Sequence, residues 1–238
     1  HSFRGEKGET VLEAALRSGI SLNYNCNNGT CGDCRARLVS GRVACWGDHG
    51  LRHPRGGLVP EGPVLVPEID DALALSAQGQ QACVRRAGGR VACWGARFAG
   101  GLEDDDGNGV VSIPGLEHVR AVAAGGSHAC AVMEDRSVQC WGASALGAVG
   151  GASGDLGTTV PPTPVADLED VRQLALGFDH SCALTRDGSV WCWGANDVGQ
   201  LGTEVDGRCE PPLGEPPDTQ LPCSAEPVRV LDRALAIA

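Results

Sequence analysis

Short apolar runs, separated by turns that contain glycine, follow one another along most of the chain. Residues 69–83, 116–130 and 168–182 each show an apolar run, a glycine-containing turn and a second apolar run. A further turn and a third run follow each of them, and Asp187-Gly188 is the best-formed of these turns. Short runs bounded by turn residues are typical of β-strands in antiparallel hairpins. The pattern therefore predicts a mainly all-β chain.

The third run of each unit ends in the tripeptide Cys-Trp-Gly. Its copies begin at Cys45, Cys93, Cys140 and Cys192, at intervals of 48, 47 and 52 residues. A fixed period of this size is typical of repeat architectures, in which each unit buries its apolar face against the next. We therefore predict two parts, an N-terminal segment at 1–41 and repeats at 42–238.

The cysteines of the repeats fall into regular pairs. Nine residues, centred on a turn, separate the two members of the pairs Cys83/Cys93, Cys130/Cys140 and Cys182/Cys192, and a proline-rich insertion contains Cys209 and Cys223. Cysteines that face each other across a hairpin can form a disulfide without backbone movement. Such a framework favours an extracytoplasmic or secreted location. The alternative is that reduced cysteines serve as small core residues.

The segment from Gly177-Phe-Asp-His180 through Asn196-Asp-Val-Gly-Gln-Leu-Gly202 resembles the regulator-of-chromosome-condensation repeats. The resemblance covers roughly four-fifths of the chain. It implies a partial β-propeller of about three to four blades. Residues 230–237 match only the opening strand of another blade, so we expect a chain truncated within a blade.

No catalytic constellation is evident in the repeats. His128 and His180 share one repeat position, which Gln81 fills in another unit, so we expect a structural role for them. The resemblance implies a non-enzymatic scaffold that binds a protein partner through its loops, whose variability leaves the partner unnamed.

The N-terminal segment has a different signature. Residues 8–20 predict a short helix, and after it Cys26, Cys31 and Cys34 follow the plant-type iron–sulfur spacing. Up to Gly41 the segment resembles the β-grasp [2Fe-2S] ferredoxin domain of oxygenase reductases. That resemblance implies a bound [2Fe-2S] cluster.

The fourth ligand of such a cluster is missing at its usual place, because the interval 35–82 contains only Cys45. Cys34 is the third iron ligand in one hypothesis and the hairpin partner of Cys45 in the other. The first makes the chain a cytoplasmic electron-transfer protein or a fragment of an oxidoreductase, whose repeats dock a partner. The second leaves a metal-free segment in an oxidising compartment.

Residues 104–111 reproduce the first half of a calcium loop. Asp104, Asp106 and Asn108 offer oxygen ligands at alternate positions before Gly109, but the twelfth position is Gly115. The alternatives are a weak calcium site and a solvated acidic loop.

Charge and hydropathy exclude two classes of partner. The net charge of the 238 residues is -11, which disfavours binding to nucleic acid. No run of 18 apolar residues exists, so we expect no membrane span, and a secretion signal could lie outside this sequence.

Overall fold

The computed structural model describes residues 35–39, 41–46, 64–78, 81–95, 109–143, 145–151, 159–209 and 220–237. The chain divides into two compact units, 1–31 and 32–238. The first unit, with the helix predicted at 8–20, lies outside the described residues. The boundary predicted at residue 41 falls at the turn between two paired strands and stays a prediction.

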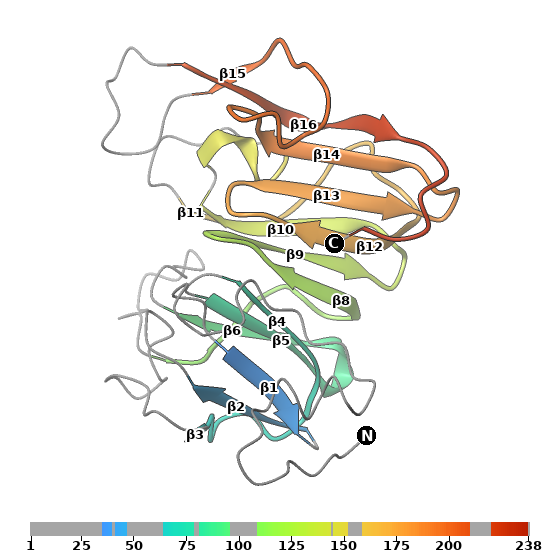
Figure 1. Ribbon diagram of the computed structural model, residues 1–238. Coiled ribbons are helices and arrows are strands. Elements are labelled where there is room, and N and C mark those ends of the chain that lie inside the picture. Colours follow the sequence, from blue (N-terminus) through green and yellow to red (C-terminus); the bar gives the residue numbers. More distant parts are fainter. Residues whose placement is uncertain are drawn as a thin grey trace, which may run out of the picture. The chain divides into compact units, whose positions relative to one another are not determined.

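The described strands form four antiparallel sheets in chain order (Figure 1). The first contains β1 (Arg35–Val39), β2 (Arg42–Trp46) and β3 (Val64–Leu65). The second contains β4 (Ala72–Gln78), β5 (Gln81–Arg86), β6 (Val91–Gly95) and β7 (Val111–Ser112). The third contains β8 (Val119–Ala124), β9 (His128–Met133), β10 (Val138–Ala143) and β11 (Thr159–Pro164). The fourth runs in the order β12 (Val171–Leu176), β13 (His180–Thr185), β14 (Val190–Ala195), β16 (Leu221–Leu231) and β15 (Arg208–Cys209).

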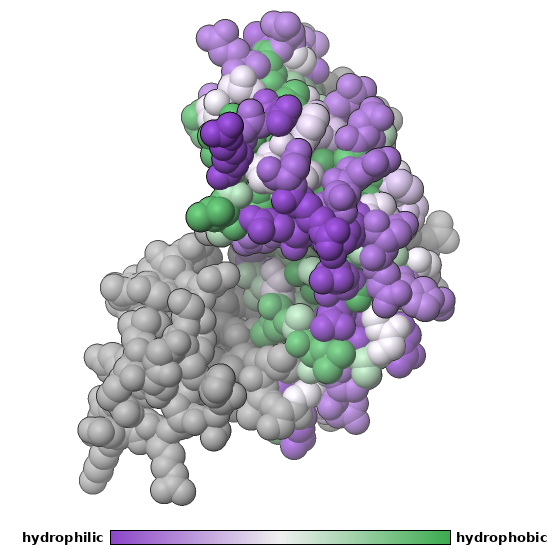
Figure 2. Space-filling view, turned by 90° about the vertical axis from the view of Figure 1, so that its right-hand side faces the viewer, coloured by the Kyte–Doolittle hydropathy of each residue, from purple (hydrophilic) through white to green (hydrophobic). Residues whose placement is uncertain are grey.

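The described part is mainly all-β, as predicted. Besides the strands it contains two short 3-10 turns, Ala87–Gly89 and Ala145–Gly147, and no α-helix. No helix within it is long and apolar enough to cross a membrane. On the face shown in Figure 2, hydrophilic side chains cover much of the described surface, with apolar patches between them.

The Cys-Trp-Gly tripeptide explains how neighbouring sheets stack. Adjacent residues of a strand point to opposite faces. Trp141 therefore packs into the core shared with the second sheet, where it lies in one cluster with Cys83 and Cys93. Its neighbour Cys140 packs into the core shared with the fourth sheet, in one cluster with Trp193. Each of the tripeptides that begin at Cys93, Cys140 and Cys192 thus contributes to two successive cores.

The glycine of the tripeptide is required by a close backbone approach. Gly194 has a φ of +107°, a conformation that side-chain-bearing residues rarely adopt. It pairs with His180, and a Cβ atom added to it would lie 2.5 Å from the carbonyl oxygen of Asp179. Any larger residue would push the second strand away from the third.

The predicted disulfide framework of the repeats is present. Cys83–Cys93, Cys130–Cys140 and Cys182–Cys192 are bonded across directly opposite strand positions, each with a Cα–Cα distance of 4.1 Å. Cys209–Cys223 is bonded as well, with a Cα–Cα distance of 5.8 Å.

The first sheet departs from this pattern. The residue opposite Cys45 is Ala36, whereas the alternative of an oxidised hairpin expected Cys34 there. The difference arises because the turn lies between Val39 and Arg42, with Gly41 at a φ of +81°, one residue further along the chain than a Cys34–Cys45 register needs. Cys34 itself lies outside the described residues.

The C-terminal residues return to the turn of the fourth sheet. The backbone nitrogen of Ala234 donates to the carbonyl oxygen of Gly188 at 2.8 Å, as that of Ala72 does to Gly41 at 2.8 Å and that of Val171 to Arg136 at 3.1 Å. The opening strand expected at 230–237 is not formed, because Val230 and Leu231 belong to β16 and residues 232–237 form no strand.

Candidate functional site

Polar side chains at one repeat position join neighbouring sheets. Gln81 is fully buried, and its Nε2 donates to the carbonyl oxygens of Gly125 and His128 in the third sheet, at 2.5 and 2.6 Å. Gln81, His128 and His180 each begin the second strand of their sheet. The position therefore contacts the next sheet along the chain.

His128 makes the corresponding contact to the fourth sheet. Its Nε2 lies 2.7 Å from Ser181 Oγ, and that hydroxyl donates to the carbonyl oxygen of Ala148 at 2.9 Å. Because a serine hydroxyl has one hydrogen, His128 must donate from Nε2, which fixes the neutral tautomer. Trp193 Nε1 also donates to Ala148, at 2.9 Å. Two side chains of the fourth sheet thus hold one carbonyl group that lies between β10 and β11 of the third sheet.

Burial is the main electrostatic influence on this network. It lowers the pKa of His128 from 6.5 to about 3, and His180 contributes in the same direction. The remaining ring nitrogen, Nδ1, has no hydrogen-bond partner among the described residues. His128 is therefore a neutral, structural donor, not a proton carrier at neutral pH.

His180 occupies the same repeat position with a different environment. It is half-buried, and its imidazole forms no hydrogen bond with a described residue. Burial lowers its pKa, while the neighbouring Asp179 raises it. A Cβ atom on Gly177 would lie 2.0 Å from the His180 ring, which explains why glycine precedes the histidine by three residues.

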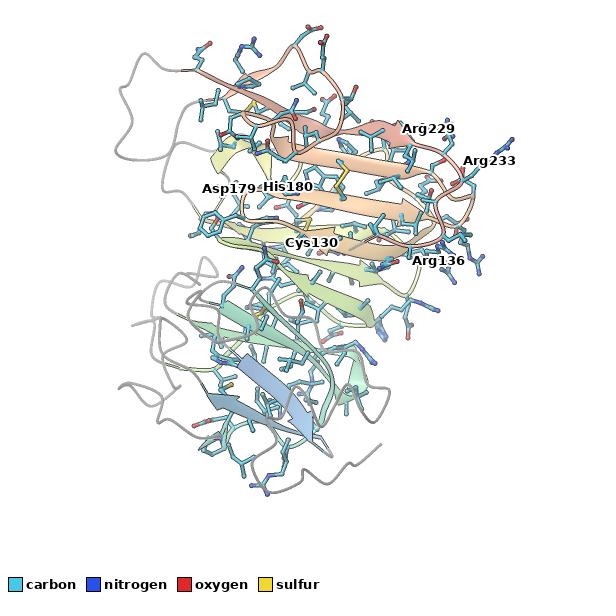
Figure 3. The ribbon with its side chains drawn as sticks, in the orientation of Figure 1. Cys130, Arg136, Asp179, His180, Arg229 and Arg233 are labelled. Carbon is cyan, nitrogen blue, oxygen red and sulfur yellow. A yellow bond between two sulfur atoms is a disulfide. The ribbon has the colours of Figure 1, made fainter. Side chains whose placement is uncertain are left out.

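Charged residues also gather at the other ends of the strands, away from the strand starts where His128 and His180 lie. Figure 3 shows Arg136, Arg229 and Arg233 there, away from Asp179 and His180. Arg136 lies 3.7 Å from Asp170, and Arg229 lies 2.5 Å from Asp232. Asp170 and both members of the Arg229–Asp232 pair are exposed to solvent, so these ion pairs contribute little free energy.

The turn of the fourth sheet contains the strongest side-chain cap. Asp187 accepts hydrogen bonds from Thr185 Oγ1 and from the backbone and hydroxyl of Ser189, which lower its pKa from 3.8 to about 2. This carboxylate therefore holds the Asp187-Gly188 turn that the sequence predicted.

Most metal-site predictions fall outside the described residues. Cys26, Cys31 and Cys34 of the iron–sulfur motif lie there, as do Asp104, Asp106 and Asn108 of the calcium loop. Cys45 is described and is 1% exposed, in one apolar cluster with Val43 and Trp94. Within the described ranges no group of three His, Cys, Asp or Glu residues could hold a metal ion.

Sequence reasoning missed Ser181, which joins two sheets. A signal was present, because the residue after the repeat position is Ala82 and Ala129 in the other units and serine only here. No sequence signal pointed to the carbonyl group of Ala148, because its role as an acceptor depends on the conformation of the loop.

Two kinds of family model match this chain. Models described as the regulator of chromosome condensation (RCC1) repeat match residues 119–148, 171–200 and 187–231. A model described as a 2Fe-2S iron–sulfur cluster binding domain matches residues 1–57.

Relatives of the N-terminal part are electron-transfer proteins. The reductase subunit of an aromatic O-demethylase from Amycolatopsis is 39% identical over 75 residues, 32% of this chain and 19% of that protein. The electron transfer component of xylene/toluene monooxygenase from Pseudomonas putida is 46% identical over 41 residues, 17% of this chain and 12% of that protein. The chain thus covers a fifth or less of these relatives.

Solved structures resemble the repeats. Prp20p from Saccharomyces cerevisiae superposes with a TM-score of 0.68 at 22% identity, over 83% of this chain and 49% of that one. Human WBSCR16 does so with a TM-score of 0.63 at 21% identity, over 84% of this chain and 52% of that one. The fold predicted for the repeats, of propeller type, is confirmed. The chain accordingly combines chromosome-condensation-type repeats, matched between residues 119 and 231, with a 2Fe-2S-type domain at 1–57.

Proposed function

We propose that this protein is a non-enzymatic binding scaffold, built from propeller-type repeats and fused to a ferredoxin-like segment. The observation that carries the proposal is the use of the buried polar side chains. Gln81, His128 and Ser181 are fully buried, and all of them bond neighbouring sheets. At Gln81 and His128 this repeat position thus supports the stacking of sheets rather than a reaction.

The partner of this scaffold is a protein that docks on its loops. Phe178 and Val198, which are 56% and 82% exposed, lie in loops that follow β12 and β14. Exposed apolar side chains on loops are typical contributors to protein interfaces. Prp20p, whose fold is similar, binds Gsp1p and histones.

The disulfides support an oxidising compartment for the scaffold. Four disulfides occur among the described residues, three of them at equivalent positions. Disulfides persist in secreted and extracytoplasmic proteins and are rare where glutathione keeps thiols reduced. We therefore place the mature protein outside the cytoplasm in this proposal.

A second candidate function is electron transfer through a [2Fe-2S] cluster. The match of residues 1–57 to a 2Fe-2S binding domain favours it, as do the electron-transfer relatives. Cys26, Cys31 and Cys34 would supply three thiolate ligands, with Cys45 as the candidate fourth. A bound cluster would let this segment accept and pass on single electrons.

Anaerobic reconstitution with iron and sulfide separates the two functions. For the scaffold we expect a colourless protein with far fewer than two irons per chain, because a cluster needs four ligands. The measurements are iron content, visible absorption and electron paramagnetic resonance. Cys34→Ser and Cys45→Ser serve as matched variants, and Cys45→Ser tests the fourth ligand directly. A stoichiometric spectrum that is lost in Cys34→Ser would establish electron transfer and refute the metal-free segment.

Calcium binding by Asp104, Asp106 and Asn108 remains a weak-site prediction. The missing carboxylate at the twelfth position removes charge and a bidentate ligand, so we expect dissociation constants no tighter than about 1 mM. Isothermal calorimetry with calcium checks this, with Asp106→Ala as the matched variant. If the heat is absent, or persists in the variant, the loop is a solvated acidic loop.

A further inference from the structure

A histidine and a disulfide recur together on one face of the second strand. The cysteine follows the histidine position by two residues, and side chains two apart on a strand share a face. In the third sheet both groups reach the same atom. Ser181 Oγ lies 2.7 Å from His128 Nε2 and 4.0 Å from Cys130 Sγ. The imidazole and the disulfide sulfur are therefore close enough for one small group to contact both.

The fourth sheet has the same histidine and cysteine, but no described serine hydroxyl is hydrogen-bonded to them. His180 and Cys182 are both half-buried, whereas His128 and Cys130 are fully buried. No described residue forms a hydrogen bond with the His180 imidazole, whereas Ser181 bonds the imidazole of His128 in the preceding repeat. Figure 3 shows the disulfide that joins β13 and β14 in this sheet.

The other described disulfides lack this combination. Cys83, Cys93, Cys130 and Cys140 are 0% exposed, which closes both bonds to a reagent in solution. Cys209 is half-buried, but the residue two positions before it is Gly207, which has no side chain to accept a proton.

We propose that the Cys182–Cys192 disulfide is a thiol–disulfide exchange site for a dithiol reductant, with His180 as the proton acceptor. This site is independent of the proposed scaffold function. The first thiol gives its proton to the neutral imidazole, and the thiolate attacks the Sγ atom of Cys182, the more exposed of the two cysteines. The Cys182–Cys192 bond breaks, and Cys192 leaves as a thiolate that takes the proton from the imidazolium. The second thiol then attacks the mixed disulfide, so the dithiol is oxidised to a cyclic disulfide and both cysteines are reduced.

Two features of the site suit this chemistry. Cys192 is 4% exposed, so attack on Cys182 is the accessible route. Burial lowers the pKa of His180, which keeps the imidazole neutral and able to accept a proton at neutral pH.

The test follows the opening of each disulfide in the oxidised full chain. The chain is treated with dithiothreitol at pH 7, quenched with acid, alkylated and mapped by mass spectrometry. We expect Cys182–Cys192 to open at least about tenfold faster than Cys130–Cys140, because the latter must wait for local unfolding. His180→Gln should slow the opening of Cys182–Cys192 about fivefold to tenfold.

A phosphine reductant makes the test specific for proton transfer. Tris(2-carboxyethyl)phosphine attacks sulfur without losing a proton, so His180→Gln should leave its rate unchanged. The fold tolerates glutamine at this position, because Gln81 fills it in the second sheet. His118→Gln, at an exposed histidine, is the matched control, and Cys209–Cys223 is the internal reference. Equal rates at the three hairpin disulfides would overturn the proposal, as would a His180→Gln variant that slows both reductants alike or neither.

Discussion

Lowering the pH from about 6.5 to 4 should destabilise the folded repeats, and His128→Gln should remove most of that loss. The pKa of His128 is about 3 in the folded chain and 6.5 in the unfolded reference. Between these values the unfolded chain binds a proton that the folded chain does not bind, so stability rises with pH. The stabilisation is fully present above 6.5 and is lost as the pH falls toward 3. At about 1.4 kcal/mol per pH unit, the loss between pH 6.5 and 4 is on the order of 3 kcal/mol.

The free energy of unfolding, measured by urea denaturation at several pH values, checks this prediction. Glutamine is the matched replacement, because Gln81 fills the same repeat position and also bonds the next sheet. Burial also lowers the pKa of His180, so the double variant should have the flattest profile. The pKa of Asp187 is lowered from 3.8 to about 2, so its protonation reduces stability only at more acidic pH. A wild-type profile that is flat between pH 6.5 and 4 would contradict a neutral, buried His128.

The sequence predicted the hairpins because their signals are local. Each turn, each alternation of apolar residues and each pair of cysteines lies within about 20 residues, so propensity and spacing suffice. Cys182 and Cys192 are equally far from the Asp187-Gly188 turn, so we expected them to face each other across the hairpin. The strand register confirms this. Nothing in that reasoning required knowledge of the neighbouring sheets.

The outer strands were not predicted, for a physical reason. Both β11 and β16 contain proline, which argues against a central strand because it cannot donate a backbone hydrogen bond. In the structure β11 lies at the edge of its sheet, where that donor is not needed. In β16 the register with β14 jumps from Val228 to Ser224, so Pro227 falls in a bulge. Only the tertiary arrangement makes these prolines compatible with strands.

The contacts between sheets were also beyond sequence reasoning. The pattern showed that a histidine recurs, but the acceptor of its proton is Ser181, 53 residues away. Such a pairing depends on how two sheets stack, which the period of the repeat predicts only in outline. The hydrogen bonds of the candidate site are therefore known only from the structure.

Replacing Trp193 should cause the largest loss of stability among single substitutions in the repeats. Its side chain is 0% exposed, and Trp193→Ala leaves a cavity in the core between the third and fourth sheets, which we expect to cost about 3 to 5 kcal/mol. Urea denaturation with the disulfides intact measures the loss.

A pair of phenylalanine variants separates packing from hydrogen bonding at the indoles. Trp193 Nε1 donates to the carbonyl oxygen of Ala148, whereas Trp141 Nε1 has no acceptor among the described residues. Both indoles are fully buried, so Trp193→Phe and Trp141→Phe remove similar volumes. Trp193→Phe should therefore cost about 1 kcal/mol more, the net free energy of one hydrogen bond. If the two variants lose equal stability, the bond to Ala148 does not contribute to the stacking of the third and fourth sheets.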